Sequence, residues 1–260
     1  MPDSNLYGGY ADWKQWQGDF AASDRHARYF AEELAEFSLA GKRVLEIGFG
    51  NGSFLAWAKA QGATVSGTEI DEAMVARACA KGFDAHAPAL DALVAQQERF
   101  DLVAAFDVFE HWDKDTLVAN LKHIHALLDA QGILVARFPN GHSPFGRVYQ
   151  YGDITHQTVL STSSVTQLAQ MTGFEVVRVS NARRVPARRD LWTVLKHHWR
   201  RRQRARIEIM LGKLYGVGRL PLDPNLTAVL RKSAPEQPAA MAPDSKKLDA
   251  RKSASCNSHR

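Results

Sequence analysis

Short apolar runs alternate with segments of helical periodicity between residues 42 and 179, and this pattern constrains the fold more than any other feature. Strands and helices that alternate along a chain pack as a parallel sheet covered by helices. The expected strands are residues 43–47, 64–69, 84–86, 100–105, 132–139 and 174–179. The expected helices lie near residues 53–61, 72–80, 115–129 and 161–171. The sequence therefore predicts an α/β fold with a mostly parallel sheet.

Composition divides the chain into four regions. Residues 1–23 are rich in aromatic side chains, among them Trp13, Trp16 and Phe20, and predict a cap or a lid. Residues 24–182 hold the alternating pattern and form the expected main domain. Residues 183–232 begin with a charged amphipathic stretch and predict a basic helical appendage. Residues 233–260 are rich in Pro, Ala, Ser and Lys and predict a disordered tail.

The basic charge lies in the C-terminal third of the chain, although the net charge of the whole is only +5. Residues 1–182 carry 14 Lys and Arg against 22 Asp and Glu, whereas residues 183–206 carry 10 against the single Asp190. A basic block predicts an anionic partner. We expect an anionic membrane surface to bind residues 183–215, with a solvated helix as the alternative. The acidic balance of residues 1–182 disfavours nucleic acid.

Two absences in the sequence bear on location and chemistry. No apolar run reaches 18 residues, and residues 1–5 lack the order of a signal peptide. Cys79 and Cys256 have neither the spacing of metal ligands nor that of a disulfide framework. We therefore expect a cytoplasmic protein, peripheral on the inner face of a membrane if the basic segment binds there, and no metal in its site.

A strand-like run that ends in an acid leads into three glycines at residues 44–52, with the sequence VLEIGFGNG. Glycines after a buried strand allow a tight turn and the close approach of a ligand, and such a loop offers amide donors. The dinucleotide-binding motif places its third glycine three residues after the second, where this chain has Ser53. The third glycine is Gly52 instead, and this spacing disfavours a dinucleotide.

This segment resembles the first motif of class I S-adenosylmethionine-dependent methyltransferases, which is an apolar strand, an acid and x-Gly-x-Gly-x-Gly. The resemblance implies that Glu46 orients the ammonium group of S-adenosylmethionine. It also implies that Glu69 binds the ribose, since carboxylate oxygens suit a vicinal diol, and that Ile70 lies against adenine. Asp71 is expected to cap the next helix instead. The loop residues implied to cradle the cofactor are Gly48, Phe49, Gly50, Asn51 and Gly52.

Further motifs extend the resemblance over about residues 40–180. Where the family has Gly-Asp after the third strand, this chain has APALD at residues 87–91. Adenine recognition is therefore expected from the backbone of Ala89 and Leu90, or from Asp91. The segment FDVFEHW at residues 106–112 resembles the signature of the fourth strand and implies that Phe106 and Asp107 lie at the cofactor or the acceptor. The implied architecture is a Rossmann-like methyltransferase fold.

Two histidines are candidates for removing a proton from an acceptor hydroxyl, because imidazole titrates near neutrality. His111 follows the fourth expected strand, at the sheet edge where open α/β folds bind ligands. His156 lies in a polar loop with Asp153, which could orient it as a carboxylate–imidazole pair. A structural role for His111 and an ordinary turn for His156 remain open. His142 is a third candidate.

The acceptor is less well defined by the sequence. The aromatic start, the basic segment and the ending at residues 223–232 resemble bacterial methyltransferases of surface-polysaccharide pathways. This resemblance implies O-methylation of a sugar or a related hydroxylated small molecule, free or linked to a carrier. A quinone or other lipid-type acceptor is an alternative. A non-catalytic, cofactor-binding scaffold in a biosynthetic complex is another, since the acid of the third motif is absent.

Overall fold

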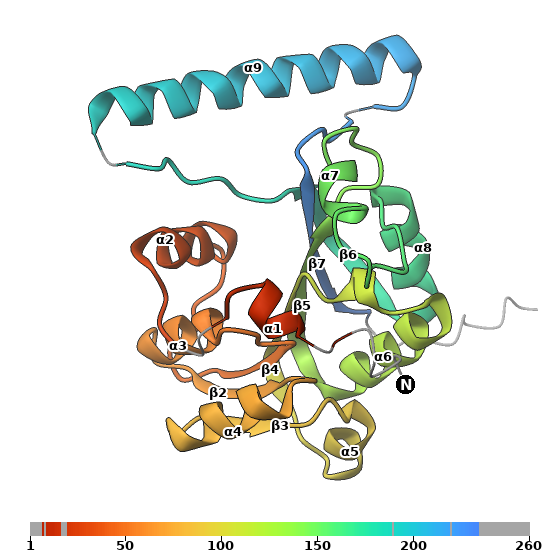
Figure 1. The fold of residues 1–260 in the computed structure, drawn as a ribbon. Helices are drawn as coiled ribbons and strands as arrows, with labels where there is room; N and C mark the ends of the chain where they lie inside the picture. Colours follow the sequence, from red (N-terminus) through yellow and green to blue (C-terminus); the bar gives the residue numbers. More distant parts are fainter. Residues whose placement is uncertain (1–6, 8, 17–19, 189, 219, 234–260) are drawn as a thin grey trace, which may run out of the picture.

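A seven-stranded sheet forms the centre of the molecule in a computed structural model that describes residues 7, 9–16, 20–188, 190–218 and 220–233 (Figure 1). The strand order is β3-β2-β1-β4-β5-β7-β6, and β1 to β5 pair in parallel. The mostly parallel α/β sheet that the sequence predicts is confirmed. The strands are β1 (Arg43–Ile47), β2 (Thr64–Thr68), β3 (Asp84–His86), β4 (Phe100–Phe106), β5 (Leu128–Pro139), β6 (Phe174–Asn181) and β7 (Asn225–Lys232).

Helices connect these strands, and acidic caps begin several of them. Asp71 accepts hydrogen bonds from the backbone of Ala73 and Met74, which confirms its expected role as the N-cap of α4. Asp113 caps α6 in the same way. The helices are α1 (Tyr10–Trp13), α2 (Asp24–Glu33), α3 (Ser53–Ala60), α4 (Glu72–Ala80), α5 (Leu90–Ala95), α6 (Lys114–Leu127), α7 (Arg147–Gln150), α8 (Thr162–Thr172), α9 (Leu191–Tyr215) and the 3-10 helix η1 (Phe109–His111).

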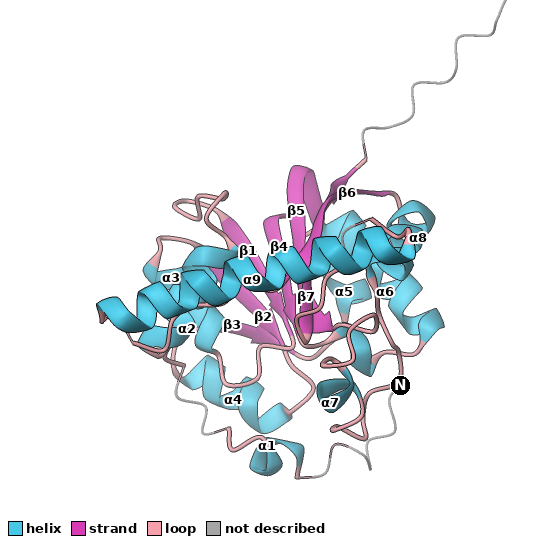
Figure 2. Cartoon of the chain, turned by 90° about the horizontal axis from the view of Figure 1, so that it is seen from above, coloured by secondary structure: helices cyan, strands magenta, loops and turns pink. Residues whose placement is uncertain are grey.

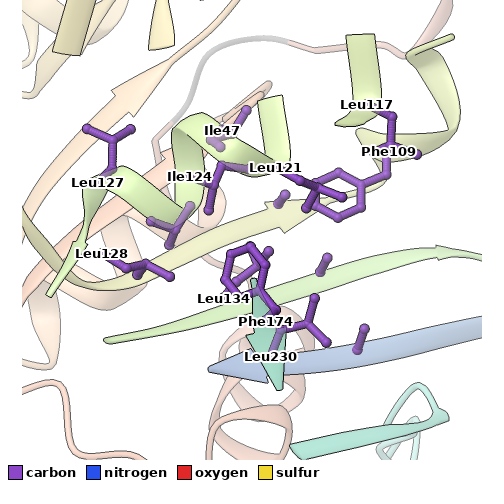
Figure 3. Packing of buried hydrophobic residues seen from close by; sticks show 14 of the residues in the cluster. Ile47, Phe109, Leu117, Leu121, Ile124, Leu127, Leu128, Leu134, Phe174 and Leu230 are labelled. Atoms are coloured by element: carbon purple, nitrogen blue, oxygen red, sulfur yellow. The ribbon is translucent and has the colours of Figure 1, made fainter. Parts of the chain in front are cut away.

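Alternate residues of the central strands enter two different cores, one on each face of the sheet. Leu45 and Val103 face the core formed with α5, α6 and α8, in which Leu121 and Ile124 are fully buried (Figure 3). Val44 and Leu102 belong to the other core, with α2, α3 and α4. Because both faces are covered, the carboxyl ends of the parallel strands remain as the edge at which a ligand can bind.

Strand β7 corrects the expected boundary of the C-terminal appendage. Residues 183–232 were expected to form a helical appendage, but Asn225–Lys232 lies inside the sheet and pairs antiparallel with both β5 and β6. Leu226 and Leu230 enter one core and Val229 the other, so the strand is apolar on both faces. A short apolar run of this kind cannot be told from a buried helical turn by periodicity alone.

Three segments differ from what local periodicity predicts. Apolar residues continue at helical spacing to Phe37, yet α2 ends at Glu33. Trp13, Trp16 and Phe20 are spaced as on one helical face, but α1 covers Tyr10–Trp13 and Phe20 has a φ of 49°. The helix α5 was not expected from the sequence. The rings of Trp16 and Phe20 instead pack against Gly50 and Gly52.

The basic segment forms α9, a 25-residue helix that stands apart from the helical layers and crosses the sheet when seen from above (Figures 1 and 2). Glu208 joins α9 to the domain, since its carboxylate accepts hydrogen bonds from Asn181 and from the backbone of Leu222. Trp192 and Trp199 are 82% and 61% exposed. Among the described residues, no helix combines the length and apolarity needed to cross a membrane. The expected disordered tail lies outside the described residues from 234 onward.

Candidate active site

The loop after β1 turns back on itself through three glycines with positive φ. Gly48, Gly50 and Gly52 have φ values of 66°, 50° and 70°, a region that side-chain-bearing residues rarely adopt. The backbone N–H groups of Gly48 and Phe49 donate to the carbonyl of Thr68, and that of Gly52 donates to Phe49. The sequence predicted that this loop offers amide donors to a ligand, but these amides donate within the protein. The glycines instead allow neighbouring groups to approach the loop backbone closely.

Glu69, at the carboxyl end of β2, holds this loop in place. Its carboxylate accepts hydrogen bonds from the backbone N–H groups of Gly50 at 2.7 Å, Ile70 at 2.7 Å and Asp71 at 3.3 Å. Burial raises the pKa of Glu69, and these three hydrogen bonds oppose that shift. Ile70 is 40% exposed next to it and offers an apolar surface.

Glu46 lies beneath the loop at the end of β1. Its side chain is buried, and its carboxylate accepts a hydrogen bond from the backbone of Leu55 in the first turn of α3 at 3.2 Å. Burial raises the pKa of Glu46 well above its ordinary value. Glu46 is thus positioned by the start of a helix, as an acid at a strand end often is.

The N-terminal aromatic residues cover the glycine loop. A Cβ atom added to Gly50 would lie 2.8 Å from the ring of Trp16, and one added to Gly52 would lie 2.1 Å from Phe20. The backbone N–H of Phe20 donates to the carbonyl of Asn51 at 3.3 Å. Residues 7–20, as far as the structure describes them, therefore pack directly on the loop in the position of a lid.

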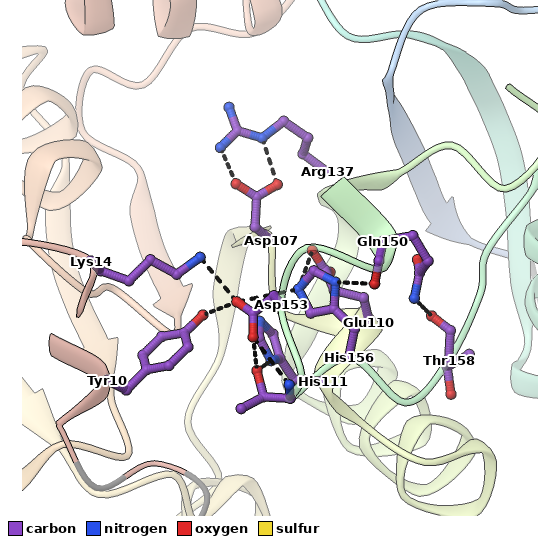
Figure 4. Close-up of polar contacts among 11 residues, drawn as sticks. Tyr10, Lys14, Asp107, Glu110, His111, Arg137, Gln150, Asp153, His156 and Thr158 are labelled. Atoms are coloured by element: carbon purple, nitrogen blue, oxygen red, sulfur yellow. Dashed lines mark hydrogen bonds and ion pairs between the residues drawn. The ribbon is translucent and has the colours of Figure 1, made fainter. Parts of the chain in front are cut away.

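The end of β4 presents an acid whose partner the sequence did not reveal. Asp107 has a φ of 59° and forms a two-pronged ion pair with Arg137 of β5 (Figure 4). The guanidinium also lies over the rings of Tyr29 and Phe106. Phe106 packs against Phe54 with ring centroids 5.1 Å apart. Phe106 therefore packs on the face of the sheet that α2 and α3 cover, and Asp107 lies at the carboxyl edge of the sheet.

The expected adenine-binding residues follow β3. Ala89 is exposed and is the N-cap of α5, whereas the side chain of Leu90 is buried in the core. The backbone of Ala89 and Leu90 thus lies at the edge of the sheet, whereas the Leu90 side chain points into the core. Asp91 lies in the first turn of α5.

His111 and His156 come together at the same edge from η1 and from the loop before α8 (Figure 4). Their ring centroids lie 4.6 Å apart. Burial lowers the pKa of His111 to about 4 and also lowers that of His156. Both imidazoles are therefore neutral near pH 7, and each keeps one ring nitrogen with a free electron pair. His142 instead contacts Thr162 at the start of α8.

Asp153 is linked to His111 through Thr155. It accepts hydrogen bonds from the Thr155 hydroxyl at 2.5 Å and backbone at 3.1 Å, and the Thr155 hydroxyl contacts Nδ1 of His111 at 2.8 Å. The distance from Asp153 Oδ2 to His156 Nε2 is 3.7 Å, too long for a hydrogen bond. The sequence suggested that Asp153 orients His156, but the backbone carbonyl of Gln150 does so, at 3.1 Å from Nδ1.

The N-terminal segment reaches this cluster as well. Lys14 forms an ion pair with Asp153 at 3.1 Å, and the hydroxyl of Tyr10 donates to Asp153 at 3.0 Å. Burial acts to raise the pKa of Asp153, but hydrogen bonds from Thr155, Lys14 and Tyr10 outweigh it and lower the pKa. The ring of Tyr10 lies edge-on to His111. The sequence offered no signal for these contacts, because their partners are more than 100 residues apart.

A cavity of about 750 Å³ adjoins the site between α2 and α9. It shares Arg137 and Tyr29 with the edge described above. Asp223, which pairs with Arg184 at 2.9 Å, is the one acid among the residues that line it. The basic residues that line it are Arg25, Arg137, Arg183, Arg184, Lys196, Arg200 and Arg204.

The groups at this edge fit S-adenosylmethionine. Glu69 presents a carboxylate suited to ribose hydroxyls, and Glu46 presents one suited to an ammonium group. The exposed Ile70 offers an apolar surface for a base, whereas the rings of Trp16 and Phe20 occupy the space against Gly50 and Gly52. These residues were expected from the sequence to bind the cofactor, and the structure places them around one loop.

Comparison with known proteins agrees with this arrangement. Residues 21–179 match a family described as methyltransferase domain. A SAM-dependent methyltransferase from Archaeoglobus fulgidus is 18% identical, with a TM-score of 0.60 over 85% of this chain and 99% of that one. The CcbJ methyltransferase from Streptomyces caelestis is 18% identical, with a TM-score of 0.57 over 89% and 100%.

A third similar structure is the complex between the Haloferax volcanii Trm112 methyltransferase activator and the putative methyltransferase. The matched chain of this complex is 15% identical, with a TM-score of 0.58 over 89% of this chain and 97% of that one. At such identities, these likenesses show the fold alone. No curated protein matches the sequence. The family match spans more than half of the chain, and it includes the glycine loop, Glu46, Glu69 and the histidine cluster. The chain therefore belongs to the methyltransferase-domain family and is a methyltransferase with a Rossmann-like fold that uses S-adenosylmethionine.

Proposed function

We propose that this methyltransferase transfers the methyl group to a hydroxyl of a sugar or a related small molecule. The observation that carries this proposal is the pair of neutral, half-buried imidazoles at the sheet edge. Methylation of a hydroxyl requires loss of its proton, whereas many nitrogen and carbon acceptors already offer an electron pair. A base with a lone pair next to the methyl donor suits an oxygen acceptor.

S-adenosylmethionine, when bound, supplies an electrophilic methyl group with a good leaving group. The protein then has to align the acceptor and exclude water. The lid residues Tyr10 and Trp16 lie over the cluster and the loop and can exclude water there. Nε2 of His156 is the atom proposed to receive the hydroxyl proton, because its Nδ1 faces the carbonyl of Gln150 and must carry the hydrogen. Asp153 positions His111 through Thr155.

The basic cavity supports an acceptor that carries negative charge. Its volume of about 750 Å³ is in the range of small-molecule sites, and most of the charged residues that line it are Arg or Lys. Guanidinium groups bind phosphate oxygens in a two-pronged geometry. A sugar joined to a phosphate-bearing carrier would place its phosphate in this cavity and its hydroxyl toward His156.

A lipid-type carrier is favoured by the surface of α9. Trp192, Trp199 and Leu195 are exposed on a helix that also carries Arg200 to Arg202. Apolar rings beside cationic side chains suit an anionic membrane surface. Peripheral attachment on the inner face would bring the site to a lipid-linked sugar or to a quinone-type acceptor. Vesicle flotation of the wild type and of Trp192→Ser/Trp199→Ser tests this, and equal recovery with anionic vesicles would exclude the attachment.

Calorimetry and methyl-transfer assays on His156→Ala test the proposed reaction. The variant is expected to bind S-adenosylmethionine with unchanged affinity and to lose transfer by about 100-fold or more, the range for removal of a general base. His142→Ala is the matched control, because this histidine lies outside the cluster. Full activity of His156→Ala on hydroxylated sugars, or activity confined to nitrogen acceptors, would refute the proposal.

A further inference from the structure

Three potential metal ligands converge at the active-site edge. One donor atom each from Glu110, His111 and His156 lies within 4.8 Å of the other two. Nε2 of His156 is 4.0 Å from Oε1 of Glu110. Two of these residues belong to the short helix η1 and the third to the loop before α8, so the fold assembles the cluster from separate segments.

Hydrogen bonds outside the cluster leave Nε2 of both histidines free of a proton. The Thr155 hydroxyl donates its hydrogen to Asp153, so its oxygen must accept from Nδ1–H of His111. Nδ1–H of His156 donates to the carbonyl of Gln150. Metal-binding histidines are usually fixed in this way, by a carbonyl or a carboxylate-linked group on the other ring nitrogen.

Glu110 is the unexplained member of the cluster. Its side chain is 1% exposed, and neither carboxylate oxygen has a hydrogen-bond partner. Ionising a buried carboxyl group without partners is unfavourable, so natural proteins pair such groups or use them to bind ions. Lys14 is paired with Asp153 instead. A cation between Glu110 and the two imidazoles would satisfy the orphaned oxygens.

We infer that Glu110, His111 and His156 bind a divalent transition-metal ion. Two imidazoles and one carboxylate favour ions such as Mn²⁺, Fe²⁺, Co²⁺ or Zn²⁺ over Mg²⁺ or Ca²⁺, which prefer oxygen ligands. Three protein ligands also leave positions open for a substrate oxygen. From the cysteines and their spacing we expected no metal. The three residues proposed here form no local motif, because His156 follows His111 by 45 residues.

The role of the ion rests on the proposed O-methylation. A hydroxyl bound to the metal would lose its proton more easily, since a bound cation lowers the pKa of a coordinated oxygen. The proton would leave to solvent or to a neighbouring base, and the alkoxide oxygen would form the new bond to the methyl carbon as the bond from that carbon to sulfur breaks. Without the ion, Nε2 of His156 takes the proton; with the ion bound, His156 is a ligand and the proton leaves to solvent or to another base.

Cobalt binding to the chelator-treated protein tests the site directly. We expect the wild type to bind one equivalent of Co²⁺ with the visible spectrum of a protein-bound ion and to unfold at a higher temperature with Co²⁺ than without it. Glu110→Gln and His156→Gln should lose that equivalent. Thr155→Val should bind Co²⁺ about 10- to 100-fold more weakly, since it removes the partner of His111. His142→Ala should behave as the wild type.

Folding is checked in the same samples. Glu110→Gln removes a buried, unpartnered carboxyl group, so without metal it should unfold at a temperature no lower than that of the wild type. Absence of Co²⁺ binding by the wild type, or an equivalent that persists in both Glu110→Gln and His156→Gln, would overturn the inference. If Co²⁺ binds but no hydroxyl is methylated, the metal site stands and the proposed O-methylation fails. If the protein binds no Co²⁺ but methylates a hydroxyl, the metal site fails and the proposed O-methylation stands.

Discussion

Glutamine in place of Glu69 is expected to weaken S-adenosylmethionine binding by about 10- to 150-fold, although the two side chains have the same shape. A carboxylate can accept a hydrogen bond from each ribose hydroxyl, whereas an amide can accept at its oxygen and must donate at its nitrogen. Loss of one hydrogen bond to a charged group costs about 1.5 to 3 kcal/mol. At about 1.4 kcal/mol for each tenfold change, this gives the stated range.

The contacts of Glu69 within the protein increase the effect. One carboxylate oxygen accepts from Gly50, and the other accepts from Ile70 and Asp71. Whichever way the glutamine amide is turned, its NH₂ group faces a backbone N–H group. The loop has to shift by enough to separate two donors, and it then no longer presents the glycine backbone in the same place.

Titration calorimetry at pH 8 measures this prediction, because burial raises the pKa of Glu69 and the carboxylate must be ionised. Glu72→Gln is the matched control, since Glu72 is exposed in the first turn of α4. It should bind the cofactor as the wild type does. A dissociation constant for Glu69→Gln within about threefold of the wild-type value would refute the assignment of Glu69 to the ribose.

Three other perturbations test the lid, the packing and the sheet. Gly67→Ala should lower the free energy of unfolding by about 1 to 3 kcal/mol, because the added Cβ would lie 2.7 Å from Phe49; an unchanged urea midpoint would contradict this. Lys14→Met removes the ion pair with Asp153 and should speed amide hydrogen exchange in α1 while leaving cofactor affinity unaltered. Exchange as slow as in the wild type would argue against Lys14 as the link that holds the lid. A chain ended after residue 224 should lose cooperative thermal unfolding, since β7 is the strand that joins β6 to β5 in the described sheet, whereas one ended after residue 233 should keep it; a cooperative transition in the shorter chain would show that β7 is dispensable.

Much of the cofactor region could be predicted because it is local in sequence. The strand, the acid Glu46 and the glycines follow one another within nine residues, and Glu69 comes 17 residues later, at the end of the next strand. Parallel strands bring their carboxyl ends to one edge, so alternation alone implied that these residues meet. The prediction of their roles at the cofactor remains to be tested by the variants above.

The histidine cluster could be predicted only in part. His111 and His156 each stood in a plausible place, but 45 residues separate them, and no pattern in the sequence linked them. Glu110 lay next to His111 in the same short segment and was not singled out, because an acid in a helix turn is usually solvated. Its burial and lack of partners depend on the surrounding loop.

The sequence by itself determined the fold class, the glycine loop and the two acids that follow β1 and β2, because each depends on residues close together in the chain. The tertiary structure decided the rest. It placed β7 between β5 and β6, although the strand follows them in the chain and was expected in an appendage. It also brought Tyr10 and Lys14 to Asp153, across more than 130 residues. Such long-range contacts are set by the packing of whole elements, which a local pattern of residues does not encode.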